Sequence, residues 1–238
     1  MKHNNDLDRF QDIIDYKFNN FRLLKNALTH SSYANEKNTG DFKDNERLEF
    51  LGDAVLELIS SDFIYNNHSD MNEGRMTRLR ASIVCEPTLA MCARDIKLNE
   101  YIMLGKGEEL TGGRNRDSIV SDAFEALIGS IYLDGGFANA KKFVQNYVLG
   151  DLEDKQLFYD SKTILQEVVQ SKGMEVEYVL LGERGPEHDK TFIAEAKTEG
   201  MFDVTGEGHT KKAAQQKAAY NALIYLKKNG TDINLKGN

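Results

Sequence analysis

The sequence predicts two domains, an all-α domain followed by a smaller α+β domain with the element order αβββα. Apolar residues recur at intervals of three and four throughout the first 150 residues, and no alternating strand pattern competes with them there. A polar, unpatterned stretch follows, and three short alternating segments with turn residues between them come after it. We therefore place the first domain at 1–150, a linker at 151–159 and the second domain at 160–229.

The periodic pattern predicts these helices in the first domain: 7–15, 21–30, 42–66, 75–95, 117–133 and 137–149. Around 105–117, glycines and charged residues predict a loop, which lacks the Gly-Lys-Ser/Thr of a phosphate-binding loop. Arg114 and Arg116 in this loop could contact a backbone phosphate or be solvated, and we favour solvation.

The second domain is expected to begin with a helix at about 161–172 and to end with a helix at 211–228. Between them, three strands are expected at 174–183, 189–199 and 201–210. This order predicts an antiparallel sheet with both helices on one face.

Composition excludes several classes of protein. The start of the chain, MKHNNDLDRF, has no apolar run behind its charges, and no stretch approaches the 18 apolar residues of a membrane span, so we expect a cytoplasmic protein that does not contact a membrane. Cys85 and Cys92 lack metal-ligand spacing, and we expect them to be reduced core residues.

The formal net charge of −8 argues against a nucleic-acid partner, because phosphates are bound by Lys and Arg. The distribution of charge reverses that conclusion. From Lys211 to Lys228 there are five lysines and no acid, which predicts a local basic patch that the overall balance conceals.

Residues 45–53 (NERLEFLGD) place three acids on one side of a predicted helix. Glu46, Glu49 and Asp53 fall within a sector of roughly 60°. The opposite side is apolar and is expected to face the core: Leu48, Leu51, Val55 and Leu58. From this segment alone, a solvated acidic face and an acidic cleft are equally favoured. Glu57, one turn beyond Asp53, is expected to be solvated.

A second predicted helix, within 121–136, repeats the pattern with Asp122 and Glu125 opposite an apolar face. Two such helices side by side could aim four carboxylates at one point, and that much negative charge tolerates burial only when a cation neutralises it. Carboxylate oxygens favour hard ions such as Mg²⁺ or Mn²⁺ over zinc.

NERLEFLGDAVLEL, the downstream SDAFEALIG and the αβββα unit together resemble the bacterial ribonuclease III family over nearly the whole chain. This resemblance implies a homodimeric endonuclease of double-stranded RNA that processes ribosomal RNA and other transcripts. It implies Mg²⁺, with Mn²⁺ as a substitute, no small-molecule cofactor, and products with a 5′-phosphate and a 3′-hydroxyl.

The resemblance also implies roles for single residues. The metal centre consists of Glu49, Asp53, Asp122 and Glu125, of which Asp53 and Glu125 are the catalytic pair. Glu46 is an accessory acid, and Phe50 inserts into the partner subunit. Glu73 is either a second accessory acid near the cleft or a carboxylate that favours a helix N-terminus. His30 is expected to be structural.

In the second domain, the resemblance implies shape recognition of the RNA minor groove by Gln166 and Glu167 on the first helix and by His188. Lys211 and Lys212, at the N-terminus of the last helix, are expected to contact phosphates. Lys217 is a weaker candidate.

Two alternatives remain open on the residues alone. A non-catalytic RNA-binding protein could keep the nuclease fold as a scaffold for dimerisation, although all four central acids are present. A helical phosphohydrolase of small nucleotides would explain the acids but not the second domain.

Overall fold

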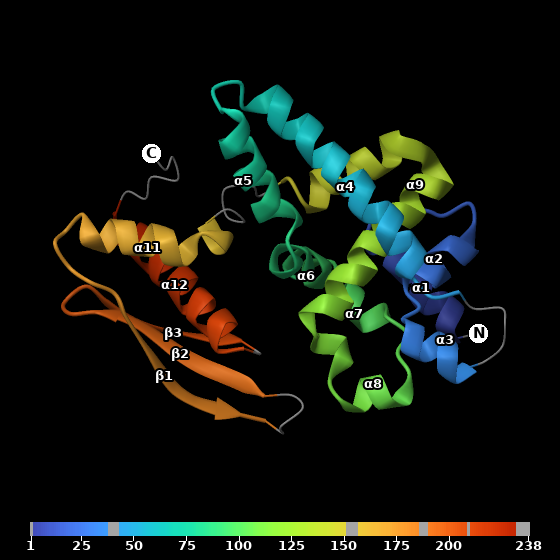
Figure 1. Cartoon of the computed structure of the whole chain (residues 1–238). Coiled ribbons are helices and arrows are strands. Elements are labelled where there is room, and N and C mark those ends of the chain that lie inside the picture. The colour runs from blue at the N-terminus through green and yellow to red at the C-terminus, as the bar shows by residue number, and fades with distance from the viewer. Residues whose placement is uncertain (1, 38–42, 151–156, 186–189, 209, 232–238) are drawn as a thin grey trace. The chain divides into compact units, whose positions relative to one another are not determined.

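The structure is a computed structural model that describes residues 2–37, 43–150, 157–185, 190–208 and 210–231. The chain divides into two compact units, Met1–Leu152 and Glu153–Asn238, here called the first and second units. The first unit is helical, and the second contains a three-stranded sheet with helices, as predicted (Figure 1). Within the described ranges, no helix has the length and apolar character needed to cross a membrane.

The helical elements of the first unit are α1 (Lys2–Ile13), α2 (Phe21–Ala27), α3 (Ser31–Lys37), α4 (Glu46–Asn67), α5 (Glu73–Val84), α6 (Glu86–Asp95), α7 (Leu98–Tyr101), α8 (Lys106–Leu110), the 3₁₀ helix η1 (Gly113–Asn115) and α9 (Asp117–Tyr147). The helices predicted at 117–133 and 137–149 are the two parts of α9. They are separated by a kink at Gly136, where φ is +76°, a value that favours glycine.

Other parts of the predicted pattern were wrong. The single helix expected at 75–95 is two helices, because Cys85 is extended (φ −76°, ψ 151°) and Pro87 lies in the first turn of α6. Proline lacks an N–H and is tolerated only where no intrahelical bond is required. The loop expected around 105–117 contains α8 and η1, and the short helices α3 and α7 were missed.

The core of the first unit is organised around α9, against which α4, α2 and α6 pack. The buried face of α4 consists of Leu48, Gly52, Val55, Leu56, Ile59, Ser60 and Ile64. Leu48 and Val55 are therefore core residues, as predicted. Leu58 is 58% exposed, so its assignment to the core was wrong.

The second unit consists of α11 (Ser161–Gln170), β1 (Glu177–Arg184), β2 (Thr191–Thr198), β3 (Phe202–Gly208) and α12 (Lys211–Lys228). The strands form an antiparallel sheet in the order β1-β2-β3. Helix α12 packs against β2 and β3, and α11 packs against α12. Alternate residues of β2, namely Ala194, Ala196 and Thr198, are buried, as expected for a strand with one covered face.

Asp134 of α9 fixes the entry to α2. Its carboxylate accepts hydrogen bonds from the Tyr16 hydroxyl at 2.8 Å and from the backbone amides of Asn19 and Asn20 at 2.9 and 2.7 Å. Burial opposes the charge of Asp134, but the bonds from Asn20, Asn19 and Tyr16 outweigh burial and lower its pKa. The middle of α9 is thereby connected to a segment 115 residues earlier in the chain.

We expect Asp134→Ala to lower the free energy of unfolding of the first unit by about 1–3 kcal/mol, because two backbone amides lose their acceptor. Asp12→Ala is the matched control, since Asp12 pairs with Lys17 and both side chains are largely exposed; its cost should stay within about 0.5 kcal/mol. Urea unfolding of the full chain measures both. Equal losses for the two variants would contradict this role of Asp134.

Candidate functional site

The acidic segment starts α4 from a fixed point in the fold. Asn45 is buried, and its carbonyl accepts hydrogen bonds from the amides of Leu48 and Glu49, both at 2.9 Å. The amide of Asn45 donates to the carbonyl of Thr29, also at 2.9 Å. Acids in the first turn of a helix are favoured by its dipole. The position of Glu49 is therefore determined by contacts on both sides of the helix start.

Three carboxylates converge where α4 crosses α9. One oxygen each from Glu49, Asp122 and Glu125 lie within 4.8 Å of one another, and all three residues are half-buried. We call these three residues the acid cluster. Asp53, one turn after Glu49, is exposed, and its negative charge acts on both Glu49 and Glu125. All four acids predicted for the metal centre thus lie in one region, with Asp53 at its exposed side.

The surroundings of the acid cluster disfavour the ionised form of its carboxyl groups. Burial, followed by the charges of Asp53, Asp122 and Glu49, raises the pKa of Glu125 to about 8. Burial and the charges of Asp122, Glu46 and Asp53 also raise the pKa of Glu49. A pKa near 8 means that Glu125 is largely protonated at neutral pH unless a cation is present.

Asp122 shows the same tendency with two opposing influences. Burial raises its pKa, while a hydrogen bond from Ser121 and the nearby His30 oppose the rise. The ring of His30 shares a 2.8 Å hydrogen bond with Ser32, whose hydroxyl accepts from the amide of Gly105 at 2.9 Å. His30 therefore has hydrogen-bonded structural contacts, and its electrostatic effect on Asp122 was not foreseen from the sequence.

The acid cluster fits a hard divalent cation. Its ligand atoms are oxygens, the type that Mg²⁺ and Mn²⁺ prefer. In the described part of the chain, the ion pairs formed by Lys and Arg do not include any of the four acids. Half-buried carboxylates that repel one another without a basic partner are stabilised when a cation binds between them.

The remaining acids have separate surroundings. Glu46 is exposed in the first turn of α4. Glu73 is exposed in the first turn of α5, and its carboxylate accepts a 2.9 Å hydrogen bond from the Thr77 hydroxyl on the same helix. Glu57, expected to be solvated, is half-buried and forms an ion pair with Arg80 at 3.5 Å.

Glu86 is an acid that sequence reasoning missed. It begins α6, and burial together with the charges of Asp117 and Asp122 raises its pKa. The negative field of the acid cluster therefore extends to α6. Only the break before Pro87, at the start of this helix, could have signalled its position.

Arg114 and Arg116 hold the α8–α9 connection. The expectation of solvation was wrong for Arg114, whereas Arg116 is exposed and forms its ion pair at the surface. The Arg114 guanidinium donates to the carbonyls of Asn99 and Ile102 at 2.7 and 2.9 Å. It also forms a two-pronged contact with Glu109. Arg116 forms an ion pair with Glu108 at 2.6 Å.

Phe50 lies on the surface of α4 with 81% of its area exposed. Phe50 is therefore not part of the core of this chain. The ring is accessible on the surface of α4, where another chain could cover it.

The predicted RNA-contacting residues that can be placed in the second unit are all exposed. Gln166 and Glu167 lie on α11, and Lys211 and Lys212 form the first turn of α12. The α12 N-terminus is capped by Thr210, whose hydroxyl accepts from the amide of Ala213 at 3.0 Å. His188 lies outside the described residues.

Two contacts hold α11 and α12 in a fixed arrangement. Lys162 of α11 donates to the side chain of Gln215 at 2.9 Å, and the Ser161 hydroxyl donates to the carbonyl of Gln216 at 3.0 Å. The ammonium group of Lys217 lies over the Tyr220 ring, 5.0 Å from its centroid. Lys217 is thus engaged with this ring, and its contact with RNA stays a prediction.

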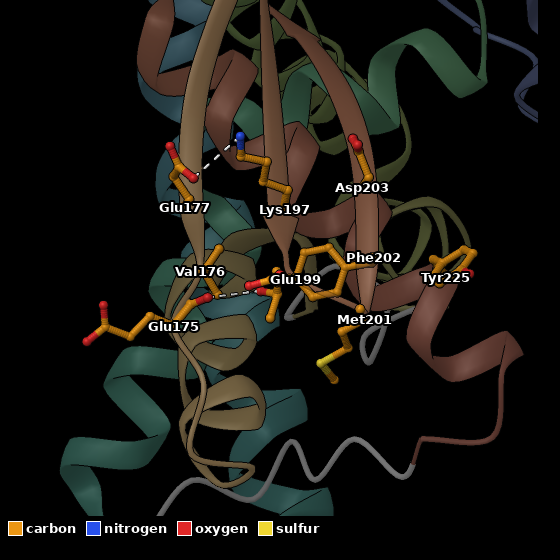
Figure 2. A pocket seen from close by; sticks show the side chains of 11 residues that line it. Glu175, Val176, Glu177, Lys197, Glu199, Met201, Phe202, Asp203 and Tyr225 are labelled. Atoms are coloured by element: carbon orange, nitrogen blue, oxygen red, sulfur yellow. Dashed lines mark hydrogen bonds and ion pairs between the residues drawn. The ribbon is translucent and has the colours of Figure 1, made fainter.

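A surface pocket in the second unit has the wrong charge for an RNA partner. Its rim carries Glu175, Glu177, Glu199 and Asp203, and a lysine in it is already paired with Glu177 (Figure 2). Tyr225, which also lines it, is about 20 Å along α12 from Lys211, at 1.5 Å per residue. The pocket is therefore distinct from the N-terminal end of α12, where Lys211 and Lys212 lie.

Comparisons with known proteins agree with the division of the chain into two units. Residues 20–152 match the family described as Ribonuclease-III-like, and residues 161–226 match the double-stranded RNA binding motif. The chain is 45% identical to Ribonuclease 3 of Listeria innocua over 93% of this chain and 98% of the relative. It is 47% identical to Ribonuclease 3 of Oceanobacillus iheyensis over 92% and 97%.

A solved structure is similar to the first unit. It is the nuclease domain of a ribonuclease III from Campylobacter jejuni, described in terms of structural flexibility in a region involved in dimer formation. It is 37% identical, covers 60% of this chain and 95% of that chain, and aligns with a TM-score of 0.56.

The raised pKa of Glu125 predicts a pH dependence of stability in EDTA. Because its folded pKa, about 8, lies above its unfolded value, its stabilising contribution is complete below the unfolded pKa and is lost as pH rises through about 8. We expect the Tm of the first unit to fall between pH 5 and 9, and Glu125→Gln to reduce that fall by a few degrees.

Glu100→Gln, a change at an exposed acid of α7, is the control and should keep the wild-type pH dependence. Thermal unfolding followed by circular dichroism measures the three proteins. Parallel curves for wild type and Glu125→Gln would contradict the assigned protonation of Glu125.

Proposed function

The chain belongs to the ribonuclease III family, and we propose that its four central acids hold the divalent metal with which it cuts RNA. The protein is an endoribonuclease of double-stranded RNA. The proposal rests on one observation, the convergence of oxygens from Glu49, Asp122 and Glu125 within 4.8 Å. Their lack of a basic partner in the described chain supports a cation as the missing counter-charge.

The roles of the acids follow from their placement. Glu49, Asp122 and Glu125 supply oxygen ligands from a half-buried site, and Asp53 adds its charge from the exposed side. A bound divalent cation lowers the pKa of a water molecule and stabilises negative charge on the phosphodiester oxygens. A cation bound there would favour the charged form of Glu125, so this residue would hold the ion as a carboxylate.

We assign Mg²⁺ as the ion, with Mn²⁺ as a substitute, because both prefer oxygen ligands. Asp53 and Glu125 are the proposed catalytic pair, and Glu46 and Glu73 are accessory acids outside the acid cluster. Products with a 5′-phosphate and a 3′-hydroxyl, and ribosomal RNA and other transcripts as substrates, are part of the same proposal. No small-molecule cofactor is included, and the cytoplasmic location remains a prediction.

The second unit is proposed to grip the duplex by its shape. Gln166 and Glu167 contact a minor groove, and Lys211 and Lys212 contact phosphates beside the α12 N-terminus. Their exposure and the hydrogen bonds between α11 and α12 support this assignment. The proposed domain limits are 1–150 for the nuclease and 160–229 for RNA binding, with a linker at 151–159; His188 remains a prediction.

The nuclease unit is proposed to form a homodimer through Phe50. The exposed ring on α4 supports this, as does the dimer-forming region described for the similar Campylobacter jejuni domain. Neither alternative from the sequence accounts for both units. A small-nucleotide hydrolase leaves the RNA-binding motif without a role, and a non-catalytic scaffold leaves the acid cluster without one.

Glu125→Gln tests the metal centre, because it preserves side-chain shape while removing a charged ligand. We expect cleavage of a labelled RNA duplex in Mg²⁺ to fall on the order of 100-fold or more, while duplex binding in EDTA is kept. The control is Glu57→Gln on α4, whose carboxylate is paired with Arg80 and which should cut normally. Cleavage by the wild type in EDTA, or cleavage by Glu125→Gln at the wild-type rate, would rule out the proposed metal centre.

Replacement of Lys211 and Lys212 by Ala tests the RNA grip. Loss of two phosphate contacts should weaken binding to all duplexes and flatten the slope of log K against log salt by up to about two. Lys227 and Lys228, replaced together, form the control at the opposite end of α12. Filter binding in EDTA over a salt series measures the slope. Equal effects of the two double variants would show that the α12 N-terminus is not the contact.

Phe50→Ala tests the dimer. Each subunit would lose a buried ring, so the dimer Kd should rise by at least about 100-fold, since burial of a Phe contributes about 1.5–3 kcal/mol. Leu110→Ala is the control, because Leu110 is 79% exposed on α8. Sedimentation equilibrium gives both constants. An unchanged dimer in Phe50→Ala would remove Phe50 from the interface.

A further inference from the structure

Two glycines bring the backbones of α4 and α9 into direct contact. A Cβ atom added to Gly52 would lie 1.8 Å from the carbonyl oxygen of Glu125 and 2.9 Å from the amide nitrogen of Gly129. A Cβ atom added to Gly129 would lie 2.3 Å from the carbonyl oxygen of Leu48 and 3.0 Å from the nitrogen of Gly52. The contact is therefore reciprocal, and neither helix has room for even a methyl group.

This contact lies at the level of the acid cluster. Gly52 comes three residues after Glu49 and directly before Asp53, and Gly129 comes four residues after Glu125. Residues three and four apart are neighbours on a helix. The backbone atom that a side chain at position 52 would strike first belongs to Glu125 itself.

We propose that Gly52 and Gly129 are positioning residues of the metal centre. By keeping α4 and α9 at backbone contact, they set the distance between the Glu49 carboxylate on one helix and those of Asp122 and Glu125 on the other. This inference rests on the proposed role of these acids as metal ligands. The glycines touch neither metal nor RNA, and they act only through the spacing of the two helices.

The positioning role differs from ordinary packing in which property a small displacement of the helices changes most. Glycine inside a helix is less stable than alanine by about 0.5–1 kcal/mol, so two glycines at a helix contact oppose helix stability. An alanine at either position would force the backbones apart by about 1 Å, whereas ligand distances tolerate only about 0.2 Å. Metal affinity should therefore respond more strongly than folding to the same displacement.

Gly129→Ala, which has the smaller overlap, is the main test, with Gly52→Ala beside it. We measure the Mn²⁺ affinity of the full chain without RNA by electron paramagnetic resonance, and thermal unfolding in EDTA. Gly129→Ala is expected to stay folded and to bind Mn²⁺ at least about 10-fold more weakly. Gly52→Ala should lose more affinity.

Two glycines serve as matched controls. A Cβ atom on Gly206 of β3 would lie 2.1 Å from the amide nitrogen of Ala218, an equivalent clash in the second unit. Gly206→Ala should lower the Tm of that unit and keep wild-type Mn²⁺ affinity. Gly107 has nothing within 4 Å of an added Cβ atom, so Gly107→Ala should change neither quantity.

A longer ligand side chain provides a rescue. Asp122→Glu adds one methylene, which roughly matches the expected widening between the helices. In the wild-type background it should weaken Mn²⁺ binding, and in Gly129→Ala it should restore part of the lost affinity. A purely structural role of Gly129 would not produce this reversal.

Each outcome is decisive. If wild type itself binds no Mn²⁺ at the acid cluster, the proposed metal centre fails. If wild type binds and Gly129→Ala binds equally well, only the positioning role fails. If neither glycine variant folds in EDTA, the positioning role is also overturned, because the backbone contact would then be needed for folding as such.

Discussion

Mutual repulsion among carboxylates at the α4–α9 crossing is the constraint on which the rest of the structure depends. Two like charges about 4 Å apart repel by roughly 4 kcal/mol at an effective dielectric constant of 20. Burial, followed by the charges of Asp53, Asp122 and Glu49, raises the pKa of Glu125 to about 8, and protonation of Glu125 relieves part of this repulsion. The apolar contacts of α4 and α9 must hold the acids together against it.

The acidic site also explains why a protein whose partner is RNA has a net negative charge. The net charge of −8 includes the three acids of the cluster and the nearby Asp53, whose charge the proposed cation would offset. In the proposed arrangement, contact with phosphates falls to the second unit, where Lys211 and Lys212 lie at the exposed start of α12. Separate units thus carry the negative charge needed for chemistry and the positive charge needed for binding.

The sequence predicted what periodicity controls. A period of 3.6 residues placed Glu49 and Asp53 on one side of α4, and alternation located the strands of the second unit. The prediction failed where a single residue interrupts the periodic pattern, as at Pro87, which lies in the first turn of α6 after the break that separates α5 from α6. Leu58 satisfied the apolar spacing but lies beyond the surface that α9 covers, because the width of a helix contact is a tertiary property.

In the candidate site too, some features could be predicted from the sequence and others depend on the fold. Its four acids could be found from their spacing and from the family resemblance, but the closeness of the helices could not. Gly52 and Gly129 are 77 positions apart in the sequence, and only the fold brings their backbones together. Arg114 has no sequence signal for its carbonyl partners either, since those partners become available only when α7 ends beside it.

The most direct test of the account is a crystal of the protein soaked in Mn²⁺ and measured for anomalous scattering. We expect a peak coordinated by oxygens of Glu49, Asp122 and Glu125, the type of ligand that a hard divalent ion prefers. A peak bound elsewhere, or carboxylates that point apart with no ion between them, would contradict it.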